Sequence, residues 1–128
     1  MPLIEIENLS VTFRAQGREV RAVQDVSFTV DEGESFGLVG ESGSGKSVTM
    51  MSLIGLLPSP PADVRAGTVM LDGRDLLKMS ADDLRDVRGA KVGFVFQDPM
   101  TSLNPVFTVG NQIMEPLIRH MGLTKKQA

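Results

Sequence analysis

The sequence predicts an α/β fold in which an antiparallel β ribbon leads into a core of strands and helices. Apolar and polar residues alternate through residues 4–13 and 20–30, which is typical of half-buried strands. Short apolar runs at 35–39 and 92–96 are typical of strands that are buried on both faces. Apolar residues at helical spacing follow the first run, so strands and helices interleave as they do in α/β proteins.

The predicted ribbon has a break in its first strand and a turn at its tip. Ile4 and Ile6 alternate in one phase and Leu9 begins the other phase, so a bulge is expected at Asn8. Gly17 marks the turn between the two strands. The ribbon is expected to occupy about residues 1–33.

A helix that stops at Pro58 is expected in the middle of the chain. Its apolar residues recur at positions i, i+3, i+4 and i+7: Met50, Leu53, Ile54 and Leu57. Residues 58–67 are expected to form a loop. A strand, a tight turn and a second strand are expected around Asp72 and Gly73.

Two further helices are expected in the second half of the chain. Ser80, with Asp83 three residues later, forms a capping-box pattern that predicts a helix over 81–88, and Gly89 ends it. Residues 97–105 are expected to form a loop. The last helix is marked by apolar residues and contains Pro116; these residues are Ile113, Met114, Leu117, Ile118 and Met121.

The segment after residues 35–39 satisfies the pattern G-x-x-x-x-G-K-[ST] in full. Its members are Gly40, Glu41, Ser42, Gly43, Ser44, Gly45, Lys46 and Ser47. Glycines let the backbone curl so that successive N–H groups point inward at phosphate oxygens, and the following helix offers its positive end. Lys46 is expected to reach the β- and γ-phosphates, and the Ser47 hydroxyl is expected to ligate Mg²⁺. The motif therefore predicts a nucleoside triphosphate site in a P-loop NTPase core.

Composition excludes several other kinds of site. The 128-residue chain has a net charge of -3, which argues against a dedicated nucleic-acid binder. It contains no cysteine and one histidine, so thiolate, iron–sulfur and histidine-cluster sites cannot be built from it. Residues 50–57 are far shorter than a membrane span, and the N-terminus does not resemble a secretory signal. No direct membrane insertion is expected.

The stretch after the second apolar run resembles a known family. Gln97, at the end of that run and downstream of Lys46, resembles the Q-loop glutamine of ABC transporter ATP-binding subunits. The surrounding sequence is similar to the dipeptide, oligopeptide and nickel permease group. The matching segments are Phe96-Gln97-Asp98-Pro99, Ser102-Leu103-Asn104-Pro105, Gly67-Thr68-Val69, Leu71-Asp72-Gly73, Leu84-Arg85 and Arg88-Gly89.

The resemblance implies ATP and Mg²⁺ as cofactors and an importer for peptides or related solutes. Phe13 stands where these proteins place an aromatic ring that stacks on adenine, and its other interpretation is an ordinary core residue. Gln97 would contact Mg²⁺ or the attacking water, and its loop would touch integral-membrane permease subunits. A second ATP-binding subunit and a cytoplasmic position, peripheral on the inner face of the cell membrane, are also implied.

The resemblance implies further motifs that we do not find after Gln97: an acidic Walker B strand, a signature motif and a switch histidine. We therefore expect an incomplete ABC ATPase core, the N-terminal portion of a longer ATPase. The core would span about 34–106, and a helical subdomain would begin at about 107–128. The chain alone is expected to hydrolyse ATP negligibly and to be marginally stable or self-associating.

Three alternatives remain open from the sequence. The first is a non-catalytic nucleotide-binding module that regulates a permease. The second is a soluble P-loop kinase, which would need a lid with arginines and no Q-loop. The third is a GTPase, because residues 86–89 match D-x-x-G, although that match ends a capped helix and no N-K-x-D is present.

Overall fold

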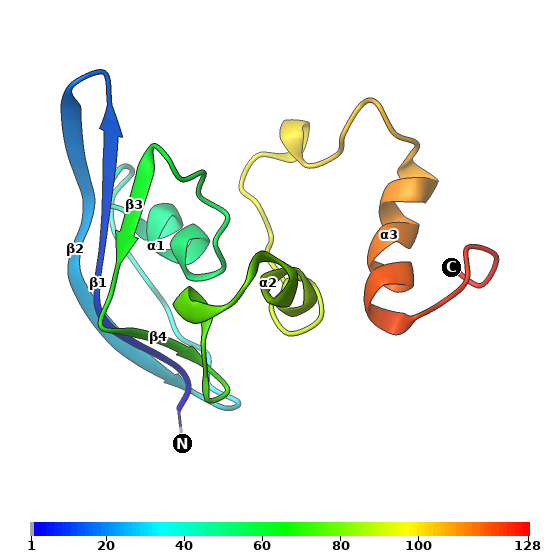
Figure 1. Cartoon of the computed structure of the whole chain (residues 1–128), viewed down its shortest axis with the longest axis horizontal. Helices are drawn as coiled ribbons and strands as arrows, with labels where there is room; N and C mark the ends of the chain where they lie inside the picture. The colour runs from blue at the N-terminus through cyan, green and yellow to red at the C-terminus, as the bar shows by residue number, and fades with distance from the viewer. Residues whose placement is uncertain (1) are drawn as a thin grey trace. The chain divides into compact units, whose positions relative to one another are not determined.

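Residues 2–128 are described by a computed structural model, except for the side chain of Thr101. The chain divides into two compact units, one extending to Met79 and the other covering Ser80–Ala128. The first unit contains the sheet and helix α1, and the second contains helices α2 and α3 with their connecting loops (Figure 1).

A long antiparallel hairpin forms the centre of the first unit. Its strands are β1 (Pro2–Ala15) and β2 (Arg18–Asp31), and Ala15 pairs with Arg18 at the tip. The other edge of β1 pairs with two short strands, β4 (Thr68–Leu71) near its start and β3 (Ala62–Arg65) near its end. Strand β5 (Arg74–Asp75) completes the order β2-β1-β4-β5. The predicted ribbon is confirmed.

The hairpin is irregular where the sequence predicts a bulge. Its register shifts between Ile6 and Leu9. Asn8 and Asp25 both have positive φ angles, and the Asn8 side-chain amide donates a 2.6 Å hydrogen bond to Asp25 Oδ1. Asparagine and aspartate tolerate this backbone region better than most residues, so the break is stabilised by the residues that occupy it.

The core of the first unit lies between the sheet and α1 (Lys46–Leu53). Four side chains from β1 and β4 are almost completely buried: Ile6, Leu9, Val11 and Val69. Leu53 and Ile54, at the end of α1, and Val23 of β2 are also buried. This packing holds the start of α1 against β2, which is where the Gly-rich segment leads into the helix.

Two predicted boundaries in the first unit are wrong. Helix α1 ends at Leu53 rather than continuing to Pro58, because Gly55 adopts a φ of 65° that a helix cannot contain. The predicted loop 58–67 contains strand β3, which pairs antiparallel with residues 10–13 of β1. The 3₁₀ helix η1 (Leu76–Lys78) follows the tight turn at Asp72 and Gly73, which is confirmed.

The predicted buried strand at 35–39 is not formed. These residues have no regular secondary structure, and Val39 is 91% exposed. A strand needs a partner for its backbone groups, and within residues 2–128 no segment pairs with this one. The two edges of β1 are already occupied by β2, β3 and β4.

The second unit contains α2 (Ala81–Val87) and α3 (Val109–Met121), which confirm the two predicted helices. Ser80 caps α2, because its hydroxyl accepts a 3.2 Å hydrogen bond from the Asp83 amide. Thr108 caps α3 in the same way, through the Asn111 amide at 3.2 Å. Among residues 2–128, none of the helices combines the length and apolarity of a transmembrane span.

The predicted strand at 92–96 is also absent. Only Val92 makes a bridge, to Arg88, and Val95 is 96% exposed. The reason is the same as for 35–39, since no neighbouring strand in the described chain receives its hydrogen bonds. The loop that follows contains the 3₁₀ helix η2 (Pro99–Thr101).

Candidate nucleotide-binding site

The Gly-rich segment 40–47 (loop 40–47) curls through the exposed residues 40–44 and the half-buried Gly45, and its last two residues, Lys46 and Ser47, begin α1. Gly43 and Gly45 have φ angles of 81° and 95°, a region that side chains with a Cβ rarely adopt. The Ser44 amide donates to the Glu41 carbonyl at 3.1 Å, which closes the turn. The curl that the motif requires is therefore present.

Gly45 is required for a second reason, which is close packing. A Cβ placed on it would lie 2.6 Å from the carbonyl oxygen of Ala22 in β2. On the helix side, the Gly45 carbonyl accepts hydrogen bonds from both the amide and the hydroxyl of Thr49, at 2.9 Å and 2.7 Å. The base of the loop is thus held between β2 and the first turn of α1.

Lys46 folds back over the loop. Its ammonium donates to the carbonyl oxygens of Gly40 and Glu41, the second at 2.8 Å, and to the Ser44 hydroxyl at 3.3 Å. The ammonium therefore occupies the concave side of the curl. Phosphate oxygens carry negative charge, so they would form stronger hydrogen bonds with this group than neutral carbonyls do.

The first turn of α1 leaves its backbone donors available. Gly45 is the N-cap residue, and no side chain caps the helix. The first amides of a helix have no partner within it and carry the positive end of the dipole. The exposed Ser47 hydroxyl belongs to this same turn. Backbone donors, an ammonium and a hydroxyl thus converge on one exposed loop, a donor set that fits a polyphosphate with a bound Mg²⁺.

Phe13 lies in the same compact unit as the loop. It is half-buried near the end of β1, where Val20 of β2 and Ala62 of β3 are its neighbours. Its stacking on adenine stays a prediction.

Gln97 lies in the second unit and is exposed. Its contact with Mg²⁺ or water therefore also stays a prediction. Within the residues that the structure describes, no three acidic or histidine side chains gather into a metal site.

Comparison with known proteins identifies the family. The ABC transporter family matches residues 23–128, which is most of the chain. The chain belongs to the ABC transporter family. Its similarity to the dipeptide and oligopeptide group, expected from the residues around Gln97, is confirmed by relatives with those names.

Two relatives are proteins of Bacillus subtilis. The oligopeptide transport ATP-binding protein OppD is 44% identical over 98% of the chain, and the dipeptide transport ATP-binding protein DppD is 47% identical over 98%. The chain spans only 35% of the length of OppD and 38% of the length of DppD.

A solved structure supports the predicted fold class. The dimeric bacterial ABC transporter cassette MJ0796 superimposes with a TM-score of 0.75 at 29% identity. The match covers 91% of the ABC chain and 47% of the cassette. An incomplete P-loop ABC core with an N-terminal ribbon is therefore confirmed as the fold class, and the family implies nucleotide binding.

Sequence reasoning missed Gln112, which organises the loop after Gln97. Its side-chain amide donates to the carbonyl oxygens of Asn104 and Phe107, at 2.8 Å and 3.0 Å. Its Oε1 accepts from the Asn104 amide at 2.7 Å. A single side chain of α3 thus holds the first and the last residue of the four-residue turn 104–107. No spacing rule connects a helix glutamine to loop carbonyls, so no sequence signal marks it.

Proposed function

We propose that the chain binds MgATP as part of the energy-coupling subunit of an ABC importer for peptides or related solutes. The observation that carries the proposal is the curled loop 40–47, with the Lys46 ammonium on its concave side. The family match and the names of OppD and DppD support the transport role.

Phosphate binding would proceed by exchange of partners at Lys46. The ammonium would leave the carbonyls of Gly40 and Glu41 and donate to the β- and γ-phosphate oxygens. The amides of Gly43, Gly45 and Lys46 would then face the same anion, as backbone donors do in other phosphate-binding concavities. The loop needs no large movement for this exchange, because its base is fixed against β2 and Thr49.

Mg²⁺ would neutralise charge on the phosphates and fix their orientation. Ser47 would supply a hydroxyl ligand from the first turn of α1, and Gln97 would supply a second oxygen or position the attacking water. Mg²⁺ usually takes one or two protein ligands and fills the rest of its shell with water and phosphate. This pair of residues therefore suits it.

The loop after Gln97 would contact the permease. Four of its apolar side chains are more than half exposed: Met100, Leu103, Val106 and Phe107. Several exposed apolar side chains in one loop are typical of a protein interface. The subunit would act with a second ATP-binding subunit, in the cytoplasm and peripheral on the inner face of the membrane. Residues 34–106 would form the core, and the helical subdomain would begin near 107.

Titration calorimetry with MgATP tests the proposal. Lys46→Ala is expected to weaken binding about ten- to a hundredfold, the value of hydrogen bonds to a charged group. Lys78→Ala is the matched control, because Lys78 is exposed and its partner, 3.8 Å away, is Asp75. Equal affinities for the wild-type chain and Lys46→Ala would rule out the phosphate role of the loop.

A further inference from the structure

One face of the β1–β2 hairpin carries a strip of residues that leads away from loop 40–47. Phe13 lies directly opposite Val20, and Ala15 lies opposite Arg18. Opposite residues in an antiparallel pair point to the same face, and so do residues two apart on one strand. These four side chains therefore share one face of the hairpin.

That face is the one against which the phosphate loop packs. Val23 is buried opposite Val11, and its Cγ2 lies 3.4 Å from the position that a Cβ on Gly45 would take. Val11 and Phe13 are two residues apart on β1, so they share a face. The strip of Phe13, Val20 and Arg18 is thus continuous with the start of α1.

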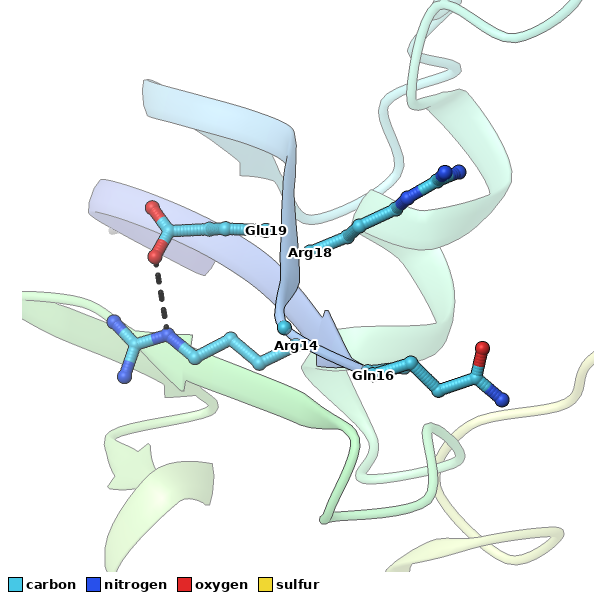
Figure 2. Close-up of a pocket in the computed structure, with 6 residues that line it drawn as sticks. Arg14, Gln16, Arg18 and Glu19 are labelled. Carbon is cyan, nitrogen blue, oxygen red and sulfur yellow. Dashed lines mark ion pairs between the residues drawn. The ribbon is translucent and has the colours of Figure 1, made fainter.

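The opposite face holds the charges that are paired. The Glu19 carboxylate forms ion pairs with Arg14, whose Nε is 3.3 Å away, and with Arg21, whose Nε is 3.1 Å away. Figure 2 shows Arg14 and Glu19 extending to one side of the hairpin, whereas Gln16 and Arg18 extend to the other. Residues 14–19 together line a hollow of about 310 Å³ at the tip.

Arg18 differs from its neighbours on the hairpin. It is exposed, and among the described residues its side chain has no hydrogen-bond partner and no carboxylate partner. Beside it, Val20 is 59% exposed although it is apolar. An unpaired guanidinium next to an exposed aliphatic side chain and an aromatic ring offers a flat ligand two kinds of contact, apolar packing and stacking.

We infer that Arg18 stacks its guanidinium on the purine base of the nucleotide whose phosphates loop 40–47 holds. The inference rests on the proposed function. Arg18 lies four positions before Ala22 on β2, and the Ala22 carbonyl oxygen faces Gly45. Four positions correspond to about 13 Å of strand. That span is comparable with the length of a nucleoside triphosphate. Phe13 and Val20 lie between the two ends, where they contact the same base.

The test compares MgATP with inorganic triphosphate, which lacks the base, in titrations of the full chain. Arg18→Ala is expected to weaken MgATP binding about two- to fivefold, the range for exposed cation–π contacts, and to leave triphosphate binding unchanged. Arg18→Lys keeps the charge but loses the plane, so it is expected to recover only part of the loss. Arg14→Ala, on the opposite face of the same hairpin, is the matched control and is expected to bind both ligands as the wild type does.

Each other outcome overturns the inference. Equal weakening of both ligands by Arg18→Ala would assign the residue to the phosphates, and no weakening would remove it from the site. An equal effect of Arg14→Ala would indicate a general effect of charge. Lys46→Ala separates the two proposals, because normal affinity for triphosphate in that variant would refute the phosphate site itself. Circular dichroism of each variant checks that the fold is intact.

Discussion

Gly45 lies where the phosphate loop packs against strand β2, and its replacement by alanine tests whether this packing stabilises the protein. Two costs are expected. A left-handed backbone costs a residue with a Cβ about 1–2 kcal/mol, and Gly45 has a φ of 95°. The new Cβ would also lie 2.6 Å from the Ala22 carbonyl oxygen, and β2 must shift to relieve this contact. Overpacking of this kind typically costs about 1–3 kcal/mol.

Gly43→Ala is the matched control, because it isolates the first cost. Gly43 has a φ of 81°, and a Cβ there would meet no atom within 4 Å. Urea unfolding of both variants, followed by circular dichroism, gives the difference directly. We expect Gly45→Ala to lose about 1–3 kcal/mol more unfolding free energy than Gly43→Ala. Equal losses would show that the packing of Gly45 on β2 does not stabilise the loop.

Three further predictions concern the second unit and the exposed apolar segments. Ser80→Ala removes the cap of α2 and should cost about 1 kcal/mol of unfolding free energy, whereas Ser59→Ala, in an exposed loop, should cost nothing measurable in the same urea titration. Gln112→Ala should speed hydrogen exchange of the Asn104 amide about fivefold, because it removes a hydrogen bond worth about 1 kcal/mol. The Asn111 amide, which donates to the Thr108 hydroxyl, is the internal control. Unchanged exchange of the Asn104 amide would contradict the role of Gln112. Val39→Lys with Val95→Lys should reduce self-association in sedimentation velocity, because both valines are more than nine-tenths exposed. Thr29→Lys, which adds one positive charge at an exposed position of the ribbon, should not.

The parts of the fold that local chemistry determines could be predicted from the sequence. Alternating apolar and polar residues predicted the hairpin, and the change of phase in that alternation predicted the irregularity at Asn8. The capping pattern of Ser80 and Asp83 predicted where α2 begins. Each of these signals lies within a few residues of the structure that it specifies. The conformation of loop 40–47 follows from its glycines in the same way.

The parts that depend on distant partners could not be predicted. The apolar runs 35–39 and 92–96 have strand composition, but composition does not supply a neighbour for their backbone groups. Conversely, residues 62–65 alternate between apolar and polar, but the run is only four residues long and follows Pro58, Pro60 and Pro61, which favour a loop. It becomes strand β3 because β1 offers it an edge. Arg18 in the first unit and Gln112 in the second unit could not be singled out from the sequence for the same reason. Their roles depend on cross-strand register and on a turn that folds back onto α3.

We propose that the backbone amides of loop 40–47 and the Lys46 ammonium hold the phosphates of ATP. Amide chemical shifts, measured by NMR while MgATP is added, test it residue by residue. We expect the largest changes on the amides of Gly43, Gly45, Lys46 and Ser47, and we expect Lys46→Ala to require about ten- to a hundredfold more MgATP to produce them. Saturable changes elsewhere in the chain, with these four amides unmoved, would contradict it.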